Sequence, residues 1–355
     1  MGELITRAFL YFDKENLGYI EKYDEINKDP DKEVSLIDII KLSENRKIIY
    51  ELRPNATGVY TEKSIKINSR GLRDYEYTLK KPSNTFRIVG IGDSIMFGLG
   101  IDLEDAFLKV LERKLNENSD SIKYEVINFA VPGYNTFMEV ETLKEKAIKY
   151  NPDLIILSFS SNDMHLPNFI KNKIKFRLDK SYFYDFILQR VSDLRQKEDL
   201  KARLIGSPYR VDENGSFYEY ESEPLNIPPE YKDMVGWDSI KIALKDLNDF
   251  TSKKDIKVVV LLDYSDNEII ELYIRNNDYY GYSEKVIYNK EVKKLAKRHK
   301  FYWVDPFFGL SEYMNKNNAT FSDLIVSEID HPNERFNQII GNQLFNFLVE
   351  NNLVG

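Results

Sequence analysis

Short apolar runs and helical patterns alternate along the middle of the chain. Apolar runs of about the length of a buried strand cover 86–92, 124–131 and 153–160. Between them, residues 104–119 and 136–150 repeat apolar side chains at the spacing of an amphipathic helix. Strands that are apolar throughout are typical of a parallel sheet covered by helices on both faces. The pattern therefore predicts parallel βαβ units.

The same alternation returns after an interruption at about 165–235. That stretch is rich in aromatic and charged residues, and we expect it to be an insertion in the α/β unit. The elements expected after it are a helix at 237–250, a strand at 257–264, a helix around 284–298, a short strand at 301–307 and a C-terminal helix at 334–350.

Residues 1–85 differ from the rest of the chain. They are rich in charged residues, asparagine and tyrosine, and alternating polar and β-branched residues with glycine turns predict short strands and hairpins. Residues 80–85 have the composition of a loop. The expected organisation is thus an N-terminal extension over 1–85, followed by an α/β domain over 86–355.

Composition and charge narrow the class of protein. The chain has 355 residues, of which 42% are hydrophobic, and a net charge of −8. An acidic chain is a poor candidate for binding nucleic acid or an anionic membrane. The absence of cysteine excludes disulfides, thiolate zinc sites and cysteine nucleophiles. No apolar run is long enough for a membrane span, and the N-terminus lacks a secretory pattern, so we expect a cytoplasmic protein. Its oligomeric state is not indicated.

Residue types that can take part in catalysis follow the predicted strands. Gly92, Asp93 and Ser94 come after the first, Gly133 after the second, and Asn162 and Asp163 after the third, while His331 precedes the last helix. The carboxyl ends of parallel strands lie at one edge of the sheet, where ligands bind. We therefore expect these residues to converge on one site.

These residue types suit acyl transfer. A serine hydroxyl is a weak nucleophile and needs a base such as histidine within hydrogen-bond reach. The tetrahedral intermediate needs donors for its oxyanion, and the backbone N–H groups of Ser94 and Gly133 with the side-chain amide of Asn162 could supply them. Asp93 is expected to brace the loop, and Asp163 to have a structural role.

The chain resembles the SGNH (GDSL) hydrolases in four short sequence blocks. The matching residues, in order, are Ser94 in "GDS", Gly133 in "NFAVPGYNT", Asn162 in "SSND" and His331 in "DHPN". The stretch before Ser94 also resembles a bacterial subgroup with an N-terminal extension. The resemblance implies a flavodoxin-like three-layer α/β/α sandwich with a parallel sheet. It further implies serine ester hydrolysis or acyl transfer, without a metal or another cofactor.

Two positions depart from the pattern of the family. Ser160 replaces the usual glycine of the third block, and Glu328 stands where the family carries the aspartate that orients the histidine. Asp330 directly precedes His331, but adjacent side chains tend to diverge, which favours Glu328 as the partner of His331. A Ser–His pair with a backbone carbonyl in the third role is the other possibility.

The functional expectation is a serine esterase that acts on a small-molecule or glycan acyl ester with a short acyl group. An acyltransferase would use the same acyl-enzyme, and a binding or scaffold protein could keep the fold without catalysis. No spacing of histidines and carboxylates indicates a metal site. His165, close to the third block, is expected to be structural or solvent-facing.

Overall fold

A five-stranded parallel sheet forms the centre of the molecule. The computed structural model describes residues 29–165, 167, 209–211, 217–219, 229–262, 264, 267–281 and 287–355. The strands are β5 (Thr85–Ile91), β6 (Lys123–Asn128), β7 (Leu154–Ser158), β10 (Lys257–Leu261) and β11 (Tyr302–Val304), in the spatial order β11-β10-β7-β5-β6. Counted along the chain this order is 2-1-3-4-5, the flavodoxin-like arrangement.

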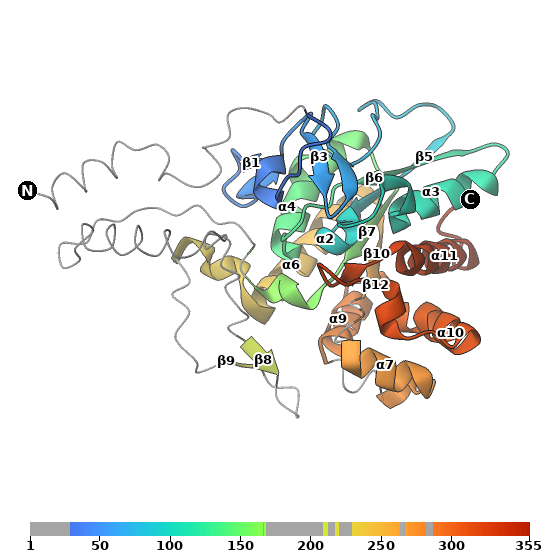
Figure 1. The fold of residues 1–355 in the computed structure, drawn as a ribbon. Helices are drawn as coiled ribbons and strands as arrows, with labels where there is room; N and C mark the ends of the chain where they lie inside the picture. The colour runs from blue at the N-terminus through green and yellow to red at the C-terminus, as the bar shows by residue number, and fades with distance from the viewer. Residues whose placement is uncertain are drawn as a thin grey trace, which may run out of the picture.

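Helices cover both faces of this sheet (Figure 1). On one face α3 (Phe107–Glu117) packs against α11 (Glu334–Glu350), with α10 (Pro306–Asn317) and α7 (Asn267–Arg275) beside them. On the other face lie α4 (Thr136–Glu145), α6 (Gly236–Thr251) and α9 (Ile287–Arg298). Two buried apolar cores, one on each side of the sheet, hold the three layers together. The expected α/β/α sandwich is confirmed.

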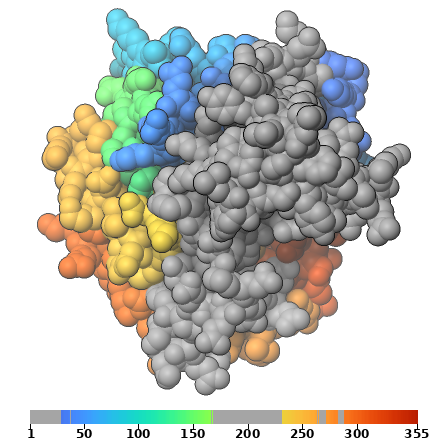
Figure 2. All heavy atoms as spheres, turned by 90° about the vertical axis from the view of Figure 1, so that its left-hand side faces the viewer, coloured from blue at the N-terminus to red at the C-terminus, as the bar shows by residue number. Residues whose placement is uncertain are grey.

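Residues 29–84, here called the N-terminal segment, add two small hairpins. They contain η2 (Leu36–Ile39), the antiparallel pair β1 (Ile40–Leu42) and β2 (Tyr50–Leu52), and the pair β3 (Thr57–Tyr60) and β4 (Lys63–Lys66). The segment lies beside α4 (Figure 2, blue beside green), where Glu51 pairs with Lys146 and Glu141 with Lys47. It also enters the core of the sheet layer, because buried Asp74 forms an ion pair of 2.8 Å with Lys109 and accepts from the N–H of Asn128 at 2.7 Å.

Short elements complete the chain. They are α2 (Ser94–Phe97), η3 (Leu103–Asp105), η4 (Ala147–Tyr150), η5 (Ser161–Met164), β8 (Tyr209–Val211), β9 (Phe217–Glu219), η6 (Pro229–Met234), η7 (Ser252–Lys254), η8 (Phe321–Leu324), β12 (Ile325–Val326) and β13 (His331–Pro332). Most of the stretch 165–235 lies outside the described residues, so its expected role as an insertion stays a prediction.

The sequence patterns miss two helices. The expected strand at 301–307 ends at Val304, because Asp305 caps a helix in which Pro306 takes the first position. That helix, α10, and the amphipathic α7 were not predicted. Within the described part of the chain, no helix combines the length and apolar character needed to cross a bilayer.

Candidate active site

The candidate residues lie at the switch point of the sheet. In this strand order, β5 and β7 are neighbours, although β6 lies between them in the sequence. Connections from the two strands leave toward opposite faces, which opens a crevice at their carboxyl ends. Ser94 follows β5, and Asn162 follows β7. The topology therefore brings together the blocks that the sequence analysis singled out.

Ser94 begins the short helix α2 directly after β5. The preceding turn needs a glycine at position 92, since a Cβ there would lie 2.8 Å from the Cβ of Met96 and 3.1 Å from that of Ser158. Asp93 caps the helix by accepting from the N–H of Ile95 at 3.0 Å. Ser94 is 9% exposed, so its hydroxyl is nearly buried but not sealed.

His331 reaches Ser94 from the far end of the chain. Its Nε2 lies 2.8 Å from the Ser94 Oγ. The ring is held by a two-residue strand, since His331 pairs with Val326 in the antiparallel β12–β13 ladder. The Nδ1 atom lies 2.5 Å from the carbonyl oxygen of Ile329. The tautomer that satisfies both contacts carries its proton on Nδ1, which leaves Nε2 free to accept the serine proton.

The structure does not bring either carboxylate to His331. Glu328 and Asp330 are both exposed, and among the described residues neither side chain is hydrogen-bonded to the ring. The tight turn explains this: the N–H groups of Ile329 and Asp330 both donate to the carbonyl of Val326. That turn puts the peptide carbonyl of Ile329 under the ring. The expectation that Glu328 orients His331 does not agree with this geometry, which matches the alternative of a backbone carbonyl.

The expected oxyanion donors lie on the loops after three neighbouring strands. The ladder between β5 and β6 continues into their loops, because the N–H of Val131 donates to the carbonyl of Gly92 at 3.1 Å. This keeps the Gly133 turn beside the Ser94 loop. The backbone N–H groups of Ser94 and Gly133 donate to no acceptor among the described residues. The side-chain amide of Asn162 donates to Asp93 at 3.3 Å. The amide of Asn162 has a second N–H, for which no hydrogen bond is seen within the described ranges.

Two acidic residues near these loops, Asp163 and Glu139, are buried. Asp163 accepts from the Thr136 hydroxyl at 2.6 Å and from the N–H of Ser160 at 3.2 Å, which ties η5 to α4. Ser160, the residue that replaces the family glycine, is itself buried. Glu139 of α4 is 1% exposed, and neither of its carboxyl oxygens has a hydrogen-bond partner among the described residues. Burial, with the nearby charges of Asp163 and Asp93, raises the pKa of Glu139 well above its ordinary value.

Arg73, which the sequence analysis did not single out, holds the C-terminal end of α2, the helix that begins at Ser94. This buried guanidinium donates to the carbonyl oxygens of Phe97 at 2.9 Å, Gly98 at 2.6 Å and Ile101 at 2.5 Å. Burial lowers its pKa to about 10, so the group stays charged at neutral pH. An arginine next to an aspartate in a polar stretch carried no local signal of this contact.

His165, directly after η5, is half-buried. Burial lowers its pKa to about 4, so the ring is neutral at physiological pH. Its backbone carbonyl accepts from the Asn135 side chain at 3.1 Å. Across the described ranges, no group of three His, Asp or Glu side chains is arranged to hold a metal ion.

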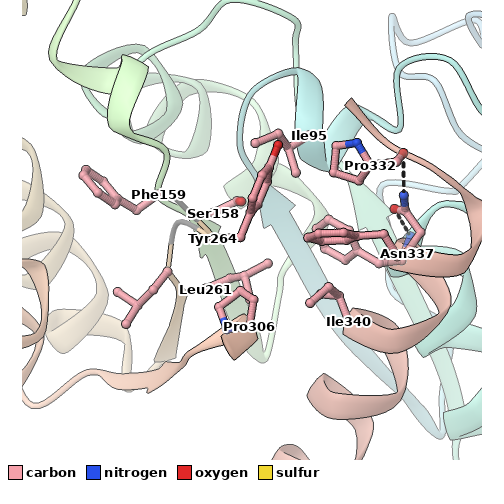
Figure 3. Close-up of a pocket in the computed structure, with 12 residues that line it drawn as sticks. Ile95, Ser158, Phe159, Leu261, Tyr264, Pro306, Pro332, Asn337 and Ile340 are labelled. Carbon is pink, nitrogen blue, oxygen red and sulfur yellow. Dashed lines mark hydrogen bonds between the residues drawn. The ribbon is translucent and has the colours of Figure 1, made fainter. Parts of the chain in front are cut away.

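An apolar pocket is lined by the residues that directly follow Ser94 and His331 in the sequence, Ile95 and Pro332 (Figure 3). It has a volume of about 310 Å³ including its open mouth. The lining also includes Ser158 at the end of β7 and Asn337 of α11. Tyr264 and Phe336 also line it, with ring centroids 4.9 Å apart. Most of that volume is open solvent: the free space enclosed by the lining residues is only about 10 Å³, roughly that of one water molecule.

The fold and the Ser–His pair define an α/β/α hydrolase-type protein, and comparison with known proteins specifies the family. The model of the GDSL-like lipase/acylhydrolase family matches residues 91–339. The chain belongs to that family. A search of curated proteins by sequence finds no significant match.

Solved structures with a similar architecture include three esterases. An acetyl xylan esterase, AlAXEase, is 14% identical with a TM-score of 0.43, covering 74% of this chain and 100% of its own. The psychrotrophic esterase EstA from Pseudoalteromonas sp. is 14% identical with a TM-score of 0.42, covering 76% and 99%. An acetylxylan esterase from Geobacillus stearothermophilus is 14% identical with a TM-score of 0.43, covering 74% and 93%.

Proposed function

We propose that this protein is a serine esterase that hydrolyses short-chain acyl esters through an acyl-enzyme. The observation that carries the proposal is the 2.8 Å contact between the Ser94 Oγ and the His331 Nε2 at the switch point of the sheet. A nucleophile and a base in direct contact, with N–H donors nearby that have no acceptor among the residues the structure describes, are the parts that acyl transfer requires.

The first half-reaction follows from this geometry. Ser94 Oγ attacks the ester carbonyl carbon while His331 Nε2 takes the hydroxyl proton. The carbonyl π electrons move to oxygen, and this oxyanion accepts from the N–H groups of Ser94 and Gly133 and from Asn162. When the intermediate collapses, the bond to the alcohol oxygen breaks. His331 gives its proton to the departing alcohol, and the acyl group stays on Ser94.

The second half-reaction repeats these steps with water. His331 Nε2 takes a proton from a water molecule while the oxygen of that water attacks the acyl carbon. His331 then gives this proton to Ser94 Oγ as the acid is released. Throughout, the Ile329 carbonyl holds the ring through Nδ1. A neutral carbonyl stabilises the imidazolium less than a carboxylate does, so its main contribution is to fix the tautomer and the orientation.

The apolar pocket supports a short acyl chain. Its lining offers little besides carbon surface, which favours the hydrocarbon end of an ester over a charged group. Its free space, about that of one water molecule, excludes a fatty acyl chain in this arrangement of side chains and favours the smallest acyl groups. The alcohol would then lie toward solvent, where a sugar or another polar alcohol can be accommodated.

The deciding experiment is labelling with a fluorophosphonate probe, which reacts with an activated serine. Wild type, Ser94→Ala and His331→Ala would be treated and then digested for peptide mass spectrometry. We expect an adduct on Ser94 in wild type, none in Ser94→Ala and much slower labelling in His331→Ala. If folded wild type is not labelled and does not hydrolyse p-nitrophenyl acetate, the proposal is wrong and a non-catalytic role is favoured.

A further inference from the structure

The N-terminal segment touches the turn that carries Gly133. The hydroxyl of Tyr50, on β2, donates to the carbonyl oxygen of Pro132 at 3.0 Å. In return, the hydroxyl of Tyr134 donates to the backbone carbonyl of Tyr50. The two rings pack edge to face at 5.3 Å, and both side chains are almost completely buried. These contacts join the segment and the turn at a fixed point.

The accepting carbonyl belongs to the peptide unit of the oxyanion donor. The carbonyl of Pro132 and the N–H of Gly133 are the two ends of one planar peptide, and they point in opposite directions across it. Whatever fixes the direction of this carbonyl therefore fixes the direction of the Gly133 N–H. Tyr50 lies on one side of this peptide, and the N–H faces away from it.

The turn has two available orientations for this peptide. The N–H of Tyr134 donates to the carbonyl of Val131 at 3.1 Å, and Gly133, at the third position, has a φ of 75°. Proline at the second position and a positive φ at the third are the signature of a type II turn. A type I turn with the same ends differs by rotation of the central peptide through about half a turn. Glycine accepts both forms, so the turn sequence does not by itself hold the type II form.

We propose that Tyr50 is a positioning residue of the active site, which selects the peptide orientation that presents the Gly133 N–H to the oxyanion. The inference rests on the proposed esterase function. The hydroxyl of Tyr50 acts twice: it holds the carbonyl in the type II orientation, and it polarises the peptide so that the N–H is a stronger donor. The N-terminal segment thereby takes part in catalysis without touching the substrate.

The test compares Tyr50→Phe with a matched control, Tyr124→Phe. Tyr124 is also buried and also donates its hydroxyl to a backbone carbonyl, that of Gly355 at 2.9 Å, but it lies at the start of β6. Each variant loses one hydroxyl-to-carbonyl bond and keeps its ring. The readouts are kcat and KM for p-nitrophenyl acetate, the rate of fluorophosphonate labelling of Ser94, and the melting temperature.

We expect Tyr50→Phe to lower kcat and the labelling rate about tenfold, less than the hundredfold or more that follows complete loss of a donor. KM and the midpoint of the pH–kcat profile should not move, because neither the pocket nor His331 changes. Tyr124→Phe should keep wild-type rates at a similar melting temperature. Equal rates in the two variants would overturn the inference, as would a Tyr50→Phe defect that appears only in KM or as a shifted pH midpoint.

A second variant covers the case in which Tyr50→Phe does not fold. Gly133→Ala keeps the Tyr50 hydroxyl but penalises the positive φ that the type II turn needs. We expect a comparable loss of kcat and labelling, and full activity in this variant would contradict the inference.

Wild type is measured first: absence of labelling there refutes the esterase proposal itself. Labelling in wild type with unchanged rates in the variants refutes only the role of Tyr50.

Discussion

The Nδ1 atom of His331 lies 2.5 Å from the carbonyl oxygen of Ile329, two residues earlier in the chain. The partner of the candidate base is therefore a neutral peptide group, supplied by the same turn that carries the histidine. Such a partner orients the ring at every pH, since it has no proton to gain or lose. The two nearby carboxylates, Glu328 and Asp330, are exposed to solvent instead.

Removing those carboxylates is expected to leave activity nearly intact. Glu328→Gln and Asp330→Asn should each keep kcat within about threefold of wild type, whereas enzymes that depend on a triad carboxylate lose about 10⁴-fold when it is neutralised. The measurement is kcat for p-nitrophenyl acetate, with His331→Ala as the inactive reference. A hundredfold loss in Glu328→Gln would show that this side chain reaches the ring during turnover.

Asn162→Ala should slow the chemical step. Its amide is the side-chain donor of the proposed oxyanion site, and losing one such donor typically costs about 10²- to 10³-fold in kcat. KM should change little, because the interaction forms mainly in the transition state. Asn118→Ala is a suitable control, since Asn118 is an exposed asparagine at the end of α3. A raised KM with normal kcat would instead assign Asn162 to ground-state binding.

Glu139 should make stability depend on pH. Its folded-state pKa is raised by burial and by Asp163 and Asp93, so the folded protein holds a proton that the unfolded chain releases above pH 4.5, the ordinary pKa of a glutamate. The contribution of this proton to the free energy of unfolding is fully present below that pH. It is lost by about 1.4 kcal/mol per pH unit as pH rises toward the folded-state pKa.

Glu139→Gln binds no such proton. The free energy of unfolding of this variant minus that of wild type should therefore increase with pH above 4.5. Urea titrations at a series of pH values between about 4 and 8 measure this difference, and the subtraction removes contributions from other carboxylates. A difference that is flat with pH would mean that Glu139 is ionised in the folded protein.

Tyr264→Ala should shift the preferred acyl length. Removing this ring enlarges the pocket beside Ser94, and each buried methylene contributes about 0.8 kcal/mol. The ratio of kcat/KM for the butyrate ester to that for the acetate ester should rise about tenfold for two added methylenes. The ratio is used because loss of the packing on Phe336 also lowers stability. Tyr280→Ala, at an exposed tyrosine, is the control. An unchanged ratio would place the acyl chain elsewhere.

The sequence alone determined the layers of the fold and singled out Ser94 and His331 as the candidate nucleophile and base. Strand and helix patterns are local, and in a parallel sheet the ends of the strands must meet, so blocks ending at Ser94, Gly133 and Asn162 converge whatever the remaining contacts are. The C-terminal helix was predicted with its observed limits, 334–350, because its amphipathic pattern begins at an asparagine cap.

Only the tertiary structure decided which group faces each of these residues. The partner of His331 depends on the path of the tight turn at residues 326–331. A change of one residue in this turn would place a side chain, instead of the carbonyl of Ile329, next to the ring. The contacts of Arg73 and Tyr50 join residues 24 and 82 positions apart, and no local pattern encodes such pairs. Glu139 looks like an ordinary charged helix residue until packing buries its carboxyl group with no hydrogen-bond partner in the described part of the chain. Local periodicity specifies elements, whereas side-chain partners follow from how the elements pack.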